Sequence, residues 1–135
     1  EIGYNYRLPN LNAALGCAQL ERLPAFLASK RALAKRYHRA FAGVPGVRVF
    51  QDAPFAESNY WLCAMILDEP DLIERDAFLS RCHAEGVLAR PVWSSMHRQA
   101  AYRDCPRMEL GTAESLEARI VNLPSSTFIE DDHAA

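Results

Sequence analysis

The sequence predicts an α/β sandwich, a small sheet with helices packed on it. Three observations indicate this class. The chain has 135 residues, enough for one domain with its own apolar core. Segments whose apolar residues recur every three or four positions alternate with short runs of branched and aromatic residues, the patterns of helices and strands. The expected order is helix, helix, strand, strand, helix, strand, helix, strand, which lets helices cover the sheet that the strands form.

Two helices are predicted at the start of the chain. The first covers residues 9–22, with Pro9 in its first turn, where a helix tolerates proline because no N–H is needed. Proline disfavours helix in the residue before it, so Pro24 is expected to interrupt the pattern. The second helix covers residues 24–42 and ends at Gly43. Its expected buried residues are Phe26, Leu33, Tyr37 and Phe41.

The centre of the chain predicts two strands and a helix. A Pro-Gly turn leads into a short strand over residues 47–50. Residues 60–67 are a continuous apolar run, which predicts a buried strand because the run is short and rich in aromatic and branched residues. Residues 72–85 predict a helix that ends at Gly86, since glycine readily adopts the left-handed conformation of a helix cap.

The last third of the chain predicts two more strands, separated by a loop and a short helix. Residues 87–92 predict a strand whose end lies at a sheet edge or exit, because Pro91 cannot donate a ladder hydrogen bond. A loop over residues 93–108 follows, and residues 113–119 predict a short helix. The final predicted strand covers residues 120–123.

Composition and charge argue against several classes of partner. The formal net charge is −2 at pH 7, so the chain has no general attraction to nucleic acid or to an anionic membrane. No apolar run approaches a membrane span, and the acidic Glu1 does not begin a secretory signal. The cysteines are scattered, and Cys17 and Cys63 lie in apolar segments where thiols are usually buried. We therefore expect a reduced, cytoplasmic setting.

The sequence predicts no metal site and no catalytic residue. The histidines, at positions 38, 83, 97 and 133, lack the spacing of metal ligands. The only lysines are Lys30 and Lys35. Both are expected on the polar side of a helix rather than in the desolvated pocket that a Schiff-base lysine needs.

The most specific pattern is residues 3–21, GYNYRLPNLNAALGCAQLE, in which a Gly-aromatic-Asn-aromatic-Arg run leads into an alanine-rich helix. It resembles the segment that follows the cofactor lysine in the DegT/DnrJ/StrS-type sugar aminotransferases. Those pyridoxal-phosphate enzymes place amino groups on nucleotide-linked deoxysugars. Weaker similarity continues in the family's order through residues 58–61, 75–79, 86–87, 90–97 and 121–126.

The resemblance implies that the chain is the C-terminal part of such an enzyme. In the family the Schiff-base lysine lies some tens of residues before the opening motif, and here only Glu1 and Ile2 precede it. Residues 1–23 would be a connecting motif and interface helix, and residues 24–135 the small domain of the aspartate-aminotransferase-like fold, fold type I. The parent would be a homodimer that binds pyridoxal phosphate and a nucleotide sugar, with glutamate as amino donor. The chain alone is expected to bind no cofactor and to be inactive.

The resemblance also implies a cofactor contact in the opening motif. Asn5 stands where similar enzymes have an asparagine that reaches the cofactor phosphate of the neighbouring subunit, and an amide NH2 is a suitable neutral donor. The alternative is that Asn5 makes a turn before the helix, a common use of asparagine. Tyr4, Tyr6 and Arg7 are expected to wall the same cavity, with Tyr6 and Arg7 in contact with substrate. Arg7 fits a structural salt bridge equally well.

Arg90, Trp93 and His97 form a second candidate site. In the family the segment after this strand reaches the nucleotide-sugar pocket. Arg90 offers a fork of donors suited to a diphosphate, and Trp93 offers a flat face suited to a sugar or base. The alternative is a loop that Trp93 tucks onto the domain, with His97 bonded to backbone. Ser94–Ser95 stands where the family more often has a proline and an apolar residue.

Two classes of function remain open from the sequence. The first is a sugar-nucleotide aminotransferase that makes amino-deoxysugars for surface glycans, with this chain as its C-terminal piece. The second is a non-catalytic α/β binding or regulatory domain that shares only ancestry with the aminotransferases. The absence of a lysine suited to the cofactor distinguishes neither class, because the resemblance places that lysine outside the chain.

Overall fold

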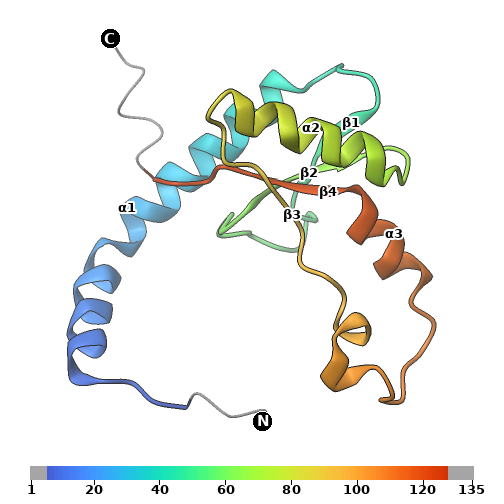
Figure 1. Cartoon of the computed structure of the whole chain (residues 1–135). Helices are drawn as coiled ribbons and strands as arrows, with labels where there is room; N and C mark the ends of the chain where they lie inside the picture. The colour runs from blue at the N-terminus through green and yellow to red at the C-terminus, as the bar shows by residue number, and fades with distance from the viewer. Residues whose placement is uncertain (1–5, 128–135) are drawn as a thin grey trace.

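A four-stranded antiparallel sheet forms the centre of the molecule, and helices pack against it (Figure 1). The computed structural model describes residues 6–127. The strand order is β1-β2-β4-β3, so β2 and β4 are the central strands and β1 and β3 are the edges. The strands are β1 (Val47–Val49), β2 (Cys63–Leu67), β3 (Arg90–Pro91) and β4 (Ile120–Leu123). The predicted α/β class is confirmed.

The predicted break between two N-terminal helices is wrong. One helix, α1, runs through Asn10–Ala40 with Pro24 in its interior. Proline there has no N–H for the carbonyl four residues earlier, yet the turns on either side keep their hydrogen bonds. Arg22 stacks over the Phe26 ring, 5.2 Å from its centroid, and links the turns around the proline. Figure 1 shows the helix changing direction between its dark-blue first half and its light-blue second half, as an interior proline produces.

Helices α2 (Leu72–Ala84) and α3 (Gly111–Arg119) lie close to their predicted positions. Asp71 caps α2, because its carboxylate accepts the backbone N–H groups of residues 73 and 74 at 2.8 and 3.1 Å. Gly86 follows α2 with a φ of 76°, the left-handed conformation expected there. The predicted loop contains two short 3-10 turns, η1 (Met96–Arg98) and η2 (Ala100–Tyr102).

Two strands are shorter than predicted, for local reasons. The run from residue 60 enters the sheet only at Cys63, because Tyr60 adopts a φ of 45°, outside the extended region. The strand predicted over residues 87–92 pairs only at residues 90–91. Before it, the Val87 amide donates to the Cys82 carbonyl at 2.8 Å, which ties this segment to the end of α2 instead of to β4.

The core lies between one face of the sheet and two helices. Alternate residues of β2, namely Cys63, Met65 and Leu67, share that face and are all at most 5% exposed. They form one cluster with Ala34 of α1 and Leu79 of α2. Of the four residues expected to be buried on the second predicted helix, Leu33 is buried and Phe26, Tyr37 and Phe41 are partly buried.

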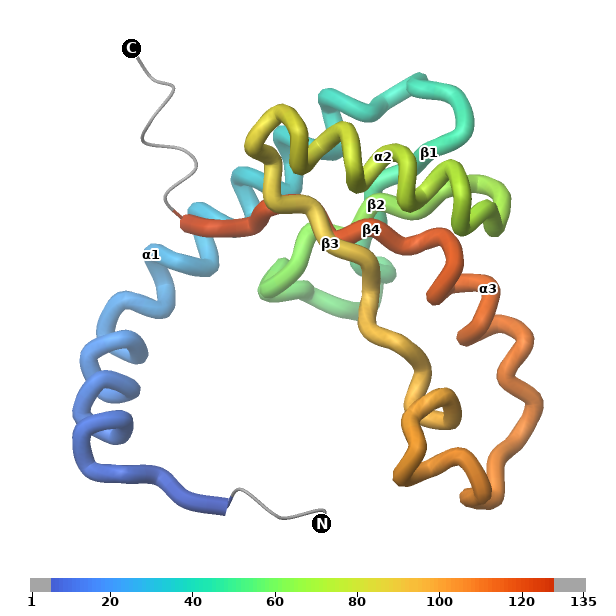
Figure 2. Tube along the Cα trace, viewed as in Figure 1, coloured from blue at the N-terminus to red at the C-terminus, as the bar shows by residue number. Residues whose placement is uncertain are grey.

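The first half of α1 does not take part in this core. Cys17, expected to be buried, is exposed, because that half of the helix leaves the sheet. Leu8, Leu11 and Leu15 are between 61% and 81% exposed. In Figure 2 the first half of α1 and the segment that carries η1 and η2 both project away from the sheet, at opposite ends of it.

Candidate functional site

The segment after β3 is held by a carboxylate of α3. Glu117 accepts the Ser95 hydroxyl at 2.6 Å, the Ser95 backbone N–H at 3.1 Å and the Ser94 hydroxyl at 3.2 Å. Its side chain is 14% exposed, and the Arg98 guanidinium lies 3.5 Å from it. The hydrogen bond from the Ser95 hydroxyl, with smaller contributions from the Ser95 amide and Arg98, holds the pKa of Glu117 below its ordinary value. Glu117 is therefore ionised at neutral pH.

His97 is bonded to a second carboxylate of the same helix. Its Nε2 lies 2.9 Å from Oε1 of Glu114, and the imidazole side chain is 15% exposed. The alternative prediction, in which His97 bonds to backbone, is wrong for Nε2, because its partner is a side-chain carboxylate. The ring also borders a pocket of about 430 Å³. The other lining residues include Met96, Tyr102, Cys105 and Leu110, so this pocket is largely apolar.

Trp93 lies on the surface and stacks against a second tryptophan. Its ring centroid is 6.0 Å from that of Trp61, with 23° between the ring planes. The two residues are 65% and 64% exposed, so Trp93 does not tuck the loop into the core. The sequence places Trp61 in the apolar run of residues 60–67 and in the weak similarity of residues 58–61, but does not mark it as a site residue. Trp61 lies just before β2, and β4 separates β2 from β3, the strand that leads into Trp93.

Arg90 lies on β3 and borders a different pocket from His97. This pocket measures about 280 Å³ and also has Asn122, Ser125 and Ser126 in its wall. Asn122 is 8% exposed, and its side-chain amide donates to the Pro91 carbonyl at 3.4 Å. The structure therefore places Arg90, Trp93 and His97 along one segment but brings only Trp93 into contact with another aromatic residue.

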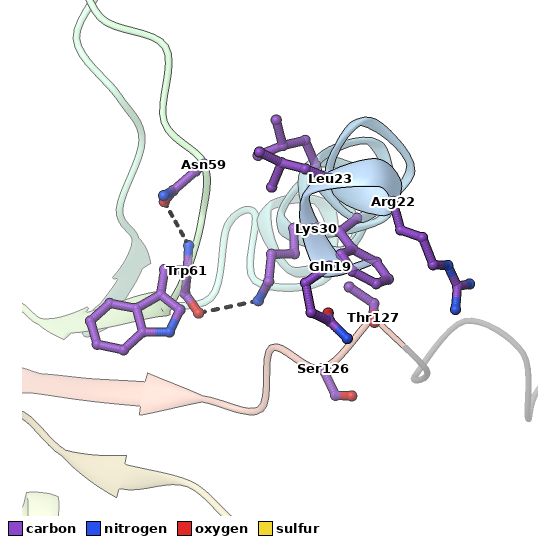
Figure 3. Close-up of a pocket in the computed structure, with 10 residues that line it drawn as sticks. Gln19, Arg22, Leu23, Lys30, Asn59, Trp61, Ser126 and Thr127 are labelled. Atoms are coloured by element: carbon purple, nitrogen blue, oxygen red, sulfur yellow. Dashed lines mark hydrogen bonds between the residues drawn. The ribbon is translucent and has the colours of Figure 1, made fainter. Parts of the chain in front are cut away.

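A third pocket, of about 480 Å³, lies between α1 and the segment after β4 (Figure 3). Lys30 stands in its wall, and its Nζ donates to the Ser125 carbonyl at 2.6 Å and to the Trp61 carbonyl at 3.3 Å. Lys30, expected on the polar side of a helix, is half-buried, and its ammonium joins two loops to α1. The remaining wall comes mostly from Gln19, Arg22, Leu23, Phe26, Leu27, Asn59, Ser126 and Thr127.

Replacing Lys30 by methionine should destabilise the chain by about 1–3 kcal/mol. The substitution keeps the apolar stem and removes a charged donor from two backbone carbonyls, one of them partly buried. Lys35→Met is the matched control, because Lys35 is exposed on the same helix. Urea titration followed by tryptophan fluorescence measures both changes. Equal midpoints for the two variants would show that the Lys30 contacts contribute nothing to stability.

The opening motif is only partly described by the structure. Asn5 and Tyr4 lie outside the described residues, so their predicted roles stay predictions. Tyr6 and Arg7 precede α1 and are both exposed, Tyr6 to 92%. Their exposure is compatible with a wall of a cavity completed by another part of the protein, and it places them at the far end of α1 from the sheet.

Among residues 6–127, no three histidine, cysteine or carboxylate side chains gather in a way that would hold a metal ion. Within that range none of the helices combines the length and hydropathy of a membrane span. All four cysteines are free thiols.

Comparison with solved structures identifies the class of this fold. The aminotransferase TlmJ from Streptoalloteichus hindustanus matches 89% of this chain with a TM-score of 0.77 and 28% identity, over 32% of its own chain. DesI, solved in the presence of its TDP-sugar product, matches 90% of this chain with a TM-score of 0.78 and 30% identity, over 31% of its own chain. The fold is that of a part of the fold-type-I aminotransferases.

Sequence comparison gives the family. The profile of the DegT/DnrJ/EryC1/StrS aminotransferase family matches residues 1–135, and the chain belongs to that family. GDP-perosamine synthase from Vibrio cholerae is 32% identical over 132 residues, which are 97% of this chain and 36% of that protein. The chain thus spans about a third of the length of the relatives it matches. The family resemblance stated from residues 3–21 is confirmed.

Proposed function

We propose that this chain is the C-terminal part of a pyridoxal-phosphate-dependent aminotransferase that acts on a nucleotide-linked keto-deoxysugar in the cytoplasm. Glutamate is the amino donor, and the product serves amino-sugar and surface-glycan synthesis. The observation that carries the proposal is the family match over residues 1–135. The relatives add support, because one is named for synthesis of a GDP-linked amino sugar and another was solved with a TDP-sugar product.

The segment from β3 into η1 is the part of the chain that we assign to the nucleotide sugar. Arg90 is exposed and presents a planar fork of donors, which suits a diphosphate. Trp93 and its partner Trp61 present exposed aromatic faces, which suit a base or the apolar face of a sugar. His97 borders the neighbouring pocket, where its ring reaches a sugar hydroxyl or the rim of the substrate. Tyr6 and Arg7 contact the same substrate from the start of α1.

The lysines of this chain do not fit the Schiff-base role that pyridoxal phosphate requires. Lys30 is bonded to two carbonyls, and Lys35 is exposed on the polar side of α1. Bound cofactor supplies the electron sink for moving the amino group, and the protein supplies binding and orientation. In the complete protein, Asn5 holds the cofactor phosphate of the neighbouring subunit, and the Schiff-base lysine comes from the part that this chain does not contain.

The test is an assay of the complete protein that carries this segment. The protein is incubated with pyridoxal phosphate, glutamate and either a GDP- or a TDP-linked 4-keto-6-deoxy sugar, and the nucleotide sugars are analysed by mass spectrometry. An amino sugar that forms only when glutamate is present supports the proposal. Tight binding of the nucleotide sugar without any turnover would instead support the non-catalytic binding domain.

The isolated chain should self-associate, and we propose a homodimer in the complete protein. The first half of α1 exposes Leu11 and Leu15, and Leu8 just before the helix is exposed as well. Exposed apolar stretches of this kind are typical of interfaces. A symmetric pair is the commonest arrangement for such a surface. Sedimentation equilibrium at micromolar concentration should show a dimer, and the double substitution of Leu11 and Leu15 by glutamate should produce a monomer.

Ile73→Glu is the matched control for this experiment. Ile73 is 84% exposed on α2, away from the first half of α1. A glutamate there adds one of the two charges of the double variant, at an apolar position about as exposed as Leu11. If the unchanged chain sediments as a clean monomer, or if Ile73→Glu dissociates it as fully as the α1 substitutions, then the first half of α1 is not the interface.

A further inference from the structure

We infer that Glu117 and Glu114 are positioning residues that hold the substrate-facing segment, residues 93–98, in its working conformation. The inference rests on the proposed function, because that function assigns Trp93 and His97 to the substrate. Neither carboxylate needs to touch the substrate. Each acts through the residues of the segment that it binds, Glu117 at the start and Glu114 at the end.

Glu117 restrains the backbone of Ser94 and Ser95, where the chain has no proline ring to do so. Ser95 adopts a φ of −57° and a ψ of 142°, close to the φ to which a proline ring is locked. A serine has no ring to hold that angle, but three hydrogen bonds from Ser94 and Ser95 converge on the one carboxylate. Bonds to an ionised acceptor are stronger than neutral ones, so Glu117 fixes the backbone there.

Glu114 holds the other end of the same segment. Residues three apart on a helix lie on one face, so Glu114 and Glu117 both contact the segment from the same side of α3. His97 bonds to Glu114 at 2.9 Å. The Arg98 guanidinium lies between them, 4.0 Å from the Glu114 carboxylate and 3.5 Å from that of Glu117. The shared cation offsets the repulsion between the two carboxylates as they bind the loop.

The helix that carries these carboxylates is itself fixed to the sheet. α3 runs directly into β4, and the Arg119 Nε donates to the Leu67 carbonyl at 2.8 Å. Arg75 of α2 donates to the Glu117 carbonyl at 3.0 Å. The segment is therefore attached to the same rigid unit at both ends, through β3 before Trp93 and through α3 after it. Loss of the carboxylates would free the segment without loosening the core.

The experiment uses Glu117→Ala in the complete protein. We expect KM for the nucleotide sugar to rise about tenfold, the scale of losing a charge-assisted hydrogen bond. KM for glutamate and the Tm should stay near those of the unchanged protein. Amide hydrogen exchange of residues 94–98 should become faster, because the Ser95 N–H loses its acceptor. Glu57→Ala is the matched control, since Glu57 is an ion-paired carboxylate whose partner is Arg31 of α1.

A proline at position 95 separates positioning from a general loss of stability. In the Glu117→Ala background, Ser95→Pro should restore most of the lost affinity, because the ring supplies the observed φ and the displaced N–H has no acceptor left. In the unchanged background, the same substitution should weaken binding, because it removes donors from Glu117. If Glu117 had a merely structural role, the losses of affinity from Glu117→Ala and Ser95→Pro would add in the double variant.

The outcomes separate the inference from the proposed function. If Glu117→Ala leaves KM for the nucleotide sugar unchanged, the inference is overturned, whether or not exchange at residues 94–98 becomes faster. If losses from Glu117→Ala and Ser95→Pro simply add, the carboxylate does not act by setting the backbone, and the inference also fails. If the unchanged protein does not aminate a nucleotide sugar at all, the proposed function fails, and the inference about substrate fails with it. Exchange rates in that protein would still report whether Glu117 holds the segment.

Discussion

The 135-residue chain on its own is expected to show no transamination when it is mixed with pyridoxal phosphate, glutamate and a nucleotide-linked keto sugar. The reaction needs a lysine that attacks the cofactor aldehyde from a desolvated site, and such a lysine must spend time as the free amine. The Lys30 ammonium donates to two backbone carbonyls, so it is already engaged in holding the fold. Lys35 is exposed to water and does not lie in a desolvated site. The expected effect is complete loss of turnover relative to the complete protein.

Two measurements check this expectation. Absorbance spectroscopy should show no imine band that survives dialysis, and mass spectrometry should show no amino sugar after long incubation. A Lys30→Met, Lys35→Met double variant serves as the blank, since it contains no lysine at all. Turnover that is present in the chain and abolished in the blank would contradict the expectation and would place the chemistry within these residues.

Local patterns in the sequence predicted most of the elements but not where packing overrides them. Helix α2, the Gly86 turn that follows it and the buried run that becomes β2 all depend on neighbours within a few residues, which a sequence displays. The continuity of α1 through Pro24 does not. A proline in a helix interior costs about 3 kcal/mol, and the intact turns and side-chain contacts on either side offset that cost. The strand before Pro91 is shortened because residue 87 bonds to the end of α2.

The candidate site was harder to predict, because its contacts join residues that are distant in the sequence. Arg90, Trp93 and His97 were named from the family resemblance, and their roles remain proposals. Trp61 meets Trp93 only because β2, β4 and β3 are neighbours in the sheet. Glu117 binds Ser95 across 22 positions, and Lys30 binds residue 125 across 95. No period or spacing in the chain displays such pairs.

The largest single-residue effect on the cofactor is expected at Asn5, in the complete protein. Asn5→Ala should weaken retention of pyridoxal phosphate by about 1.5–3 kcal/mol, or about 10- to 150-fold in Kd, because the phosphate loses one hydrogen bond to a charged group. The fold should be unaffected, so the Tm of the cofactor-free protein should not change. Titration of that protein with pyridoxal phosphate, followed by fluorescence, measures the Kd.

Asn12→Ala is the control that separates a phosphate contact from a local turn. Asn12 is an exposed asparagine of the first turn of α1, in the same motif as Asn5. If Asn5 only makes a turn before the helix, Asn5→Ala slightly lowers the stability of the fold. The Kd for the cofactor is then the same in Asn5→Ala as in Asn12→Ala. If Asn5 reaches the phosphate, the effect depends on the neighbouring subunit. Mixed dimers with one intact subunit should then lose affinity at only one of their two sites, an outcome that a turn residue would not produce.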